Sequence, residues 1–254
     1  MKNGIFVLFC CLLIVAKGQE KAEENMTSIA TDRPDQTETP DVVPLRYFQM
    51  ETGFNAERNY DIWHFVHPTI LWKAGVFKST ELRVITEVSS VHDSTGRYRA
   101  GLAPLEIGFK TAICEERKAQ PKISFIAHMA IPYVATKNQR TKYFAPNFRF
   151  SMEHTLKEHI SLGYNLGMHW DGDSPYPSFI YTIANGFEPA ERWYLYYESF
   201  GEIPIKAKSV HSFDAGVAYL IRNNMQIDAS AGFQLYPFLG GWYASLGYSF
   251  RIPR

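Results

Sequence analysis

The sequence predicts an all-β protein: an up-and-down antiparallel transmembrane β-barrel of about 12 strands, preceded by an N-terminal extension. Three observations predict this fold. Apolar and polar residues alternate over repeated segments of about ten residues, as in strands with two different faces. Aromatic residues make up 15% of the chain, an excess typical of strands and interfaces. Beyond the first eighteen residues, no apolar run is long enough for a transmembrane helix.

The first element, residues 1–18, has the pattern of a cleaved export signal. Lys2 supplies the positive start, residues 5–16 form an apolar stretch, and Ala16-Lys17-Gly18 offers small residues for cleavage. The mature chain is therefore expected outside the cytoplasm.

Charge and cysteine content argue against a nucleic-acid-binding protein and against a domain held by an internal disulfide. Lys and Arg number 26 and Asp and Glu 26 in the whole chain, a net charge of zero. Removing residues 1–18 takes away two lysines and no acids, which leaves −2. No basic excess points to nucleic acid as a partner. Of the three cysteines only Cys114 lies beyond the signal, so an intramolecular disulfide is excluded.

Residues 159–171 show the alternation most clearly. Every second residue from Ile160 to Trp170 is apolar, and the residues between them include serine, asparagine, histidine and two glycines. Similar patterns predict strands over residues 45–57, 62–76, 80–92, 101–113, 120–132, 144–152, 159–171, 177–187, 192–200, 209–222, 225–237 and 242–250. Pro68 and Pro146 fall inside two of these and predict either a bulge or a shifted boundary, because proline cannot donate to the ladder.

The connections between the predicted strands alternate in length. Short ones fall around residues 77–79, 115–118, 156–158, 188–190 and 223–224, and longer ones at 133–141, 171–175 and 201–208. Short turns at one end, longer loops at the other and an even strand count are typical of outer-membrane barrels.

Alternation alone does not show whether the apolar face of each strand points outward to lipid or inward to a core. A soluble sandwich or lipocalin-like barrel has the same period of two with its apolar side inside. Three features favour the membrane barrel: charges and glycines share the polar face, aromatics gather at strand ends, and the chain closes on an alternating aromatic strand. The predicted lumen-lining residues are Lys73, Arg83, Glu87, Glu106, Lys110, His128, Arg149, Glu153, His169, Asp214, Arg222 and Asp228. We expect acids and bases to be roughly balanced there, without strong selection for one sign of ion.

Residues 19–44 form a charged, proline-rich extension that fits no ordinary strand. Its central motif is Thr31-Asp32-Arg33-Pro34-Asp35-Gln36-Thr37-Glu38, too dense in charge for a lipid-facing surface. One interpretation is that this motif enters the barrel and pairs with lumenal charges such as Arg83, Lys110 or Arg149. The other is a solvated periplasmic arm that its prolines keep extended.

This eight-residue motif, placed between a signal peptide and a β ladder, resembles the entry motif of the outer-membrane transporter family named after the meta-pathway of phenol degradation. The rest of the resemblance is the barrel pattern and the aromatic ending over residues 45–252; the tail departs from it, since Arg251 to Arg254 follow Phe250. The resemblance implies a passive outer-membrane channel for small molecules, hydrophobic or aromatic ones among them. It implies no individual functional residue.

Two other classes of function stay open. His92 and Ser94 share a strand face near an outward loop, where a lipid hydrolase would act, although no orienting Asn or Asp is evident. A barrel that does not transport, with function in its loops, is the other alternative. The histidines lack a metal-ligand spacing, and we expect no enzyme activity, metal or cofactor. The expected partners are a lipid bilayer in the outer membrane of a Gram-negative bacterium, the barrel assembly machinery through the C-terminal strand, and a small-molecule solute.

Overall fold

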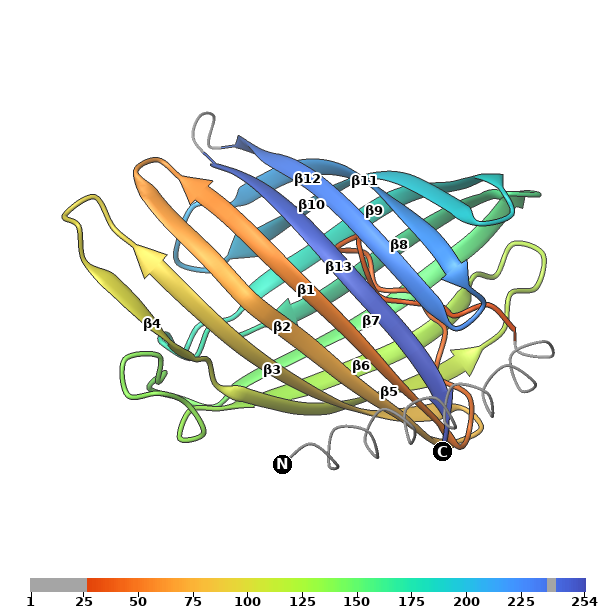
Figure 1. Cartoon of the computed structure of the whole chain (residues 1–254), viewed down its shortest axis with the longest axis horizontal. Coiled ribbons are helices and arrows are strands. Elements are labelled where there is room, and N and C mark those ends of the chain that lie inside the picture. The colour runs from red at the N-terminus through yellow and green to blue at the C-terminus, as the bar shows by residue number, and fades with distance from the viewer. Residues whose placement is uncertain (1–26, 237–240) are drawn as a thin grey trace, which may run out of the picture.

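The computed structural model describes residues 27–236 and 241–254, and the predicted signal peptide at residues 1–18 lies outside the described residues. The described chain is a closed antiparallel β-barrel, as predicted (Figure 1). Within those two ranges, no helix is long and apolar enough to cross a membrane.

Apart from β4 and β5, which both pair with β3, each described strand pairs with its neighbours along the chain, and the first and last strands close the barrel. Tyr47 lies opposite Pro253 at one end of this seam, and Asn59 lies opposite Gly241 at the other. The strands are β1 (Tyr47–Asn59), β2 (Ile62–Phe77), β3 (Thr80–His92), β4 (Tyr98–Leu102), β5 (Leu105–Cys114), β6 (Lys122–Ile131), β7 (Ala145–Lys157), β8 (Ile160–His169), β9 (Ser178–Ala190), β10 (Trp193–Pro204), β11 (Val210–Arg222), β12 (Met225–Tyr236) and β13 (Gly241–Pro253).

The strand predicted over residues 101–113 is divided in the structure. We call the end of the barrel with the longer connections the loop end and the opposite end the turn end. β4 pairs with the half of β3 nearer the loop end, and β5 pairs with the half nearer the turn end. The break falls at Ala103 and Pro104, where proline has no amide hydrogen for the ladder and the Ala103 amide instead donates to the Glu87 carbonyl at 2.9 Å. β4 and β5 therefore lie one after the other beside β3 and together take the place of a single strand. The thirteen described strands thus form a barrel equivalent to twelve strands.

The two prolines inside predicted strands behave differently. At Pro68 the register of β2 shifts against both neighbours, between Val66 and Thr69, so the expected bulge is present. Pro146 is the second residue of β7, opposite Met129. There the missing donor falls at the strand end, which explains why the ladder tolerates it.

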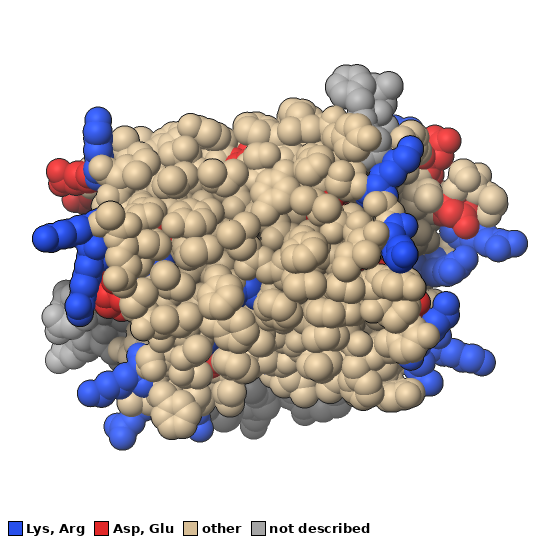
Figure 2. Space-filling model, turned by 180° about the vertical axis from the view of Figure 1, so that it is seen from behind, with Lys and Arg blue, Asp and Glu red and all other residues tan. Residues whose placement is uncertain are grey.

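The interior is polar and the exterior apolar, the reverse of a soluble protein. In β8, Asn165 is buried inside while its neighbour Leu166 is 54% exposed outside. Figure 2 shows one side of the barrel, where charged residues gather at the two ends and a broad, almost uncharged surface separates them. Large apolar side chains such as Phe54, Leu166 and Leu246 are exposed on the strands. This is the lipid-facing belt of a membrane barrel.

Aromatic pairs lie near both ends of the barrel. Trp63 and Trp242 meet edge to face near the loop end, with ring centroids 5.5 Å apart, and Trp193 and Tyr219 meet near the turn end at 4.8 Å. Amphipathic rings at these levels suit membrane interfaces. The tail beyond Phe250 continues β13 to Pro253, and the Arg251 guanidinium lies over the Tyr47 ring.

Candidate transport lumen

Residues 27–44 run inside the barrel (Figure 1). The segment enters from the turn end, where the Ile29 amide donates to the Asn223 carbonyl at 2.7 Å. It reaches the middle of the lumen and returns, and the Val43 amide donates to Glu81 at 2.5 Å shortly before β1 begins. We call residues 27–44 the lumenal segment. Of the two interpretations of the extension, the structure has the inserted one.

One side of the lumenal segment is held by cations of the wall. Asp32 contacts Lys73 at 2.6 Å, Arg83 at 3.0 Å and Lys110 at 2.6 Å. These cations come from β2, β3 and β5, and Lys73 lies directly opposite Arg83 in the ladder. All three side chains are almost completely buried. Burial raises the pKa of Asp32, but the three cations outweigh burial and hold that pKa well below its usual range.

Glu38 extends this ionic cluster toward β7. Its carboxylate lies 2.7 Å from Arg83 and 3.6 Å from Arg149. Its backbone is bound by Asn165, which accepts from the Glu38 amide at 2.8 Å and donates to the Glu38 carbonyl at 3.0 Å. Burial raises the pKa of Glu38, yet the cations, led by Arg83, lower it to about 2. The motif thus pairs with lumenal cations at two points.

The opposite wall binds the segment through a carboxylate. Glu198 of β10 accepts hydrogen bonds from the amides of Gln36 at 2.5 Å and Thr37 at 3.0 Å. It also accepts from the Thr37 hydroxyl at 2.7 Å. Asp35 lies beside Glu198, and within residues 27–236 and 241–254 no cation forms an ion pair with it. Burial followed by the charge of Glu198 raises the pKa of Asp35 well above its usual range. The lumenal segment therefore lies between cations of β2, β3 and β5 on one side of the lumen and the carboxylate of β10 on the other.

The predicted lumen-lining residues fall into two groups. Lys73, Arg83, Lys110, Arg149 and Asp228 contact the lumenal segment directly. The others take different positions: Glu87 accepts from Thr69 at 2.6 Å, His169 lies 3.4 Å from Glu202, Asp214 accepts from the Tyr243 hydroxyl, His128 is buried, Glu106 and Glu153 are half-buried, and Arg222 is exposed at the turn end of β11.

Several residues that hold the lumenal segment or its cations are not among the predicted lumen-lining residues. Glu51 contacts Lys73 at 2.5 Å, and Glu81 binds both Val43 and Arg83. Glu81 precedes Arg83 by two residues, so the period of two already places it on the same face. Glu198 gave no comparable signal, because its partners are backbone amides of a distant segment.

His92 and Ser94 do not form the contact that a hydrolase needs. His92 ends β3, and Ser94 lies in the turn that follows. Asp93 organises this turn by accepting from the amides of Thr95 at 2.9 Å and Arg97 at 3.0 Å. Over residues 27–236 and 241–254, no hydrogen bond joins the His92 and Ser94 side chains, and no group of three or more His, Cys, Asp or Glu could hold a metal ion.

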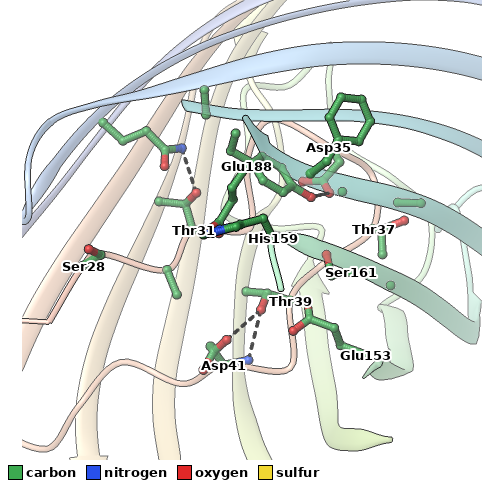
Figure 3. A pocket seen from close by; sticks show the side chains of 18 of the residues that line it. Ser28, Thr31, Asp35, Thr37, Thr39, Asp41, Glu153, His159, Ser161 and Glu188 are labelled. Carbon is green, nitrogen blue, oxygen red and sulfur yellow. Dashed lines mark hydrogen bonds and ion pairs between the residues drawn. The ribbon is translucent and has the colours of Figure 1, made fainter. Parts of the chain in front are cut away.

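Two cavities flank the lumenal segment. The first, of about 480 Å³, opens at the turn end, and Figure 3 shows Thr37, Thr39 and Asp41 of the segment around it with Glu153 and Ser161 of the wall. The second, of about 650 Å³, lies on the loop side. Arg33, Asp35 and Glu38 line both cavities, so the middle of the segment separates them.

Comparison with known proteins gives one family and a set of similar folds. A family model described as "Putative MetA-pathway of phenol degradation" matches residues 31–252. No curated protein matches this chain. An outer membrane channel from Pseudomonas putida F1 is similar in structure, with a TM-score of 0.70 and 10% identity over 86% of this chain and 99% of that one.

Two further solved structures are similar in fold. The KdgM porin in complex with disordered oligogalacturonate has a TM-score of 0.54 and 7% identity, over 80% of this chain and 98% of that one. The transport unit of the autotransporter AIDA-I from Escherichia coli has a TM-score of 0.51 and 8% identity, over 87% and 92%. At these identities the likeness concerns the fold alone.

Proposed function

The chain belongs to the family described as "Putative MetA-pathway of phenol degradation", and from this premise we propose that it is a passive outer-membrane channel for small molecules. The path runs through the barrel lumen, and the lumenal segment stands in that path. The signal-like start at residues 1–18 and the large apolar side chains exposed on the outer surface of the barrel support residence in an outer membrane.

The observation that carries this proposal is the pair of cavities on the two sides of the lumenal segment. One opens toward the turn end and one toward the loop end, and the same three residues, Arg33, Asp35 and Glu38, line both. A solute that enters either cavity meets the middle of the segment. Passage therefore requires residues 33–38 to move by the width of a solute, while the ends of the segment stay anchored.

The loop-side cavity favours solutes with an apolar part. Val66, Leu71 and Ile85 line it from β2 and β3, and Phe200 lines it from β10. Charged side chains, Glu87 and Arg149 among them, share the same cavity. Apolar patches beside polar groups suit a small ring or short chain that carries a hydroxyl or carboxyl group. The proposed solutes are therefore small aromatic or aliphatic compounds of this kind.

Liposome swelling tests the proposal. Vesicles that contain the purified protein are challenged with sodium benzoate, sodium phenylacetate, glycerol and a series of sugars, and vesicles without protein serve as the control. We expect entry above the control for the small solutes, faster for the aromatic ones at equal size, and a steep loss as size approaches a disaccharide. If no solute enters faster than in empty vesicles, the channel proposal is wrong and a binding or structural barrel takes its place.

A further inference from the structure

Three residues form one cross-strand row at the seam that closes the barrel. Gly53 of β1 lies directly opposite Gly247 of β13, and Gly247 lies directly opposite Asp228 of β12. Two glycines in adjacent positions leave a flat strip of backbone on the lumenal side, and the Asp228 carboxylate ends it. A Cβ at Gly247 would lie 2.4 Å from one Asp228 oxygen and 2.5 Å from the other, so the carboxylate extends over the strip.

The guanidinium of Arg33 lies in this strip. A Cβ at Gly53 would come within 2.1 Å of Nη1 and 2.5 Å of Cζ of Arg33, and a Cβ at Gly247 within 2.4 Å of Nε. Carbon atoms this close to a planar group would force it out. Glycine is thus required at both positions by the close approach of Arg33.

Hydrogen-bond acceptors at the edge of the strip match the guanidinium. Arg33 Nη2 donates to Asp228 at 2.9 Å and to the Ser245 hydroxyl at 2.9 Å. The Asp228 side chain is completely buried, and its second oxygen is buried without a hydrogen-bond partner among the described residues. A planar cation with several N–H groups is the ligand that such a carboxylate, hydroxyl and flat floor select.

The strip is reached from the loop-side cavity, which Arg33, Gly53 and Ser245 line. The Arg33 side chain keeps 22% of its surface exposed. A small solute that occupies this cavity therefore meets the guanidinium and its site.

We propose that the Gly53–Gly247–Asp228 row is a guanidinium-binding site, occupied by the chain's own Arg33, which locks the middle of the lumenal segment against the seam. A free guanidinium or amidinium ion takes the same site when the Arg33 side chain is absent. In the native chain the tethered side chain has a high effective concentration, so free ions compete only weakly. The effect of the lock on solute flux rests on the proposed channel function, but ligand binding at the row does not.

The test compares three variants with ethylguanidinium as the probe. Arg33→Ala empties the site, and Gly247→Ala fills it with a methyl group. Arg58→Ala, which removes an exposed arginine at the loop end of β1, is the matched control. Thermal unfolding in detergent measures binding, and liposome swelling measures flux. Both Arg33→Ala and Gly247→Ala should unfold at lower temperature than the native protein and admit solutes severalfold faster.

Ethylguanidinium distinguishes the variants. At millimolar concentration it should raise the unfolding temperature of Arg33→Ala and slow its solute entry, with ethylammonium giving a smaller effect. It should leave Gly247→Ala and Arg58→Ala unchanged. If Arg33→Ala shows no ethylguanidinium-dependent shift in unfolding temperature, or if Gly247→Ala shows the same shift, the site is refuted. If the shift occurs but no variant conducts any solute, the site holds and the channel function fails.

Discussion

Asp32 accepts a hydrogen bond from the Lys110 ammonium at 2.6 Å, although 78 residues separate them in the chain. Lys73 and Arg83 contact the same carboxylate. Three cations from three strands therefore share one partner that belongs to no strand. The barrel wall would carry buried, poorly paired cations without the lumenal segment, so segment and wall form one structural unit.

Replacing Asp32 by alanine should destabilise the whole barrel. A buried ion pair that loses one partner typically costs about 3–5 kcal/mol, and here three cations lose the same partner. The free energy of unfolding in vesicles, measured against urea, should fall by an amount in that range. Asp61→Asn removes an exposed carboxylate whose side chain is 79% exposed and serves as the control. An unchanged unfolding midpoint for Asp32→Ala would show that the cations rearrange at no cost.

Acid should weaken the attachment of the segment at Glu38. The pKa of Glu38 is about 2 in the folded protein, against 4.5 for the free side chain. A lowered pKa contributes stability that is fully present above pH 4.5 and is lost as the pH falls through 2. The unfolding free energy of Glu38→Gln should therefore change less between pH 5 and pH 2 than that of the native protein. Parallel curves for the two proteins would contradict this.

Asp35 should have the opposite dependence. Its pKa is raised well above 3.8 by burial and then by Glu198, so its contribution is present at low pH and is lost as the pH rises through the folded value. Asp35→Asn should gain stability relative to the native protein at alkaline pH and little at pH 4. The measurement is the difference in unfolding free energy between Asp35→Asn and the native protein, taken from pH 4 to alkaline pH. A difference that does not change with pH would refute the prediction.

Glu198→Ala should release the middle of the segment. It removes the acceptor for the Gln36 and Thr37 amides, and hydrogen bonds to charged groups are worth about 1.5–3 kcal/mol each. Amide exchange at these two positions should accelerate by about tenfold or more. Glu202→Ala, on the same strand at the loop end and 3.4 Å from His169, is the control. Unchanged exchange at residues 36 and 37 would mean that Glu198 does not hold them.

The lipid-facing belt predicts a depth-dependent cost for charge. Leu166 lies in the middle of β8, away from both strand ends, and is 54% exposed on the outer surface of the barrel. If this position is near the bilayer midplane, Leu166→Arg should lower the free energy of unfolding by about 2–4 kcal/mol. Leu156→Arg, at the turn end of the same surface and similarly exposed at 53%, should cost roughly 0–1 kcal/mol. Refolding free energies into vesicles give both values. Equal costs at the two positions would argue against a membrane-embedded belt.

The fold was predictable because a period of two is a property of each strand by itself. Each of the twelve predicted segments has a counterpart in the structure, and the polar side of β8 follows the expected alternation. The division at Pro104 was not predicted, although two signals mark it in the sequence: the proline has no amide hydrogen for the ladder, and the outward-facing apolar positions change phase between Leu102 and Ile107.

The lumenal contacts were only partly predictable. Alternation indicates that Arg83 and Lys110 share a face with other charges, but it does not say which charge each one meets. Glu198 accepts hydrogen bonds from the backbone amides of Gln36 and Thr37. Gly53 and Gly247 contact the side chain of Arg33, which is distant from both in the sequence. Such contacts depend on the path of residues 27–44 through three-dimensional space, which no local pattern encodes.

The break between β4 and β5 makes one part of the wall unlike the rest. Over the described residues β4 is hydrogen-bonded as a strand only to β3. Its other side is held by the β6–β7 connection: the Thr136 amide donates to the Leu102 carbonyl at 2.9 Å, and the Asn138 side chain donates to the Ala100 carbonyl at 3.2 Å. Because a few loop contacts replace a continuous ladder there, thermal unzipping of the cylinder should begin at β4 rather than at the seam between the two chain ends.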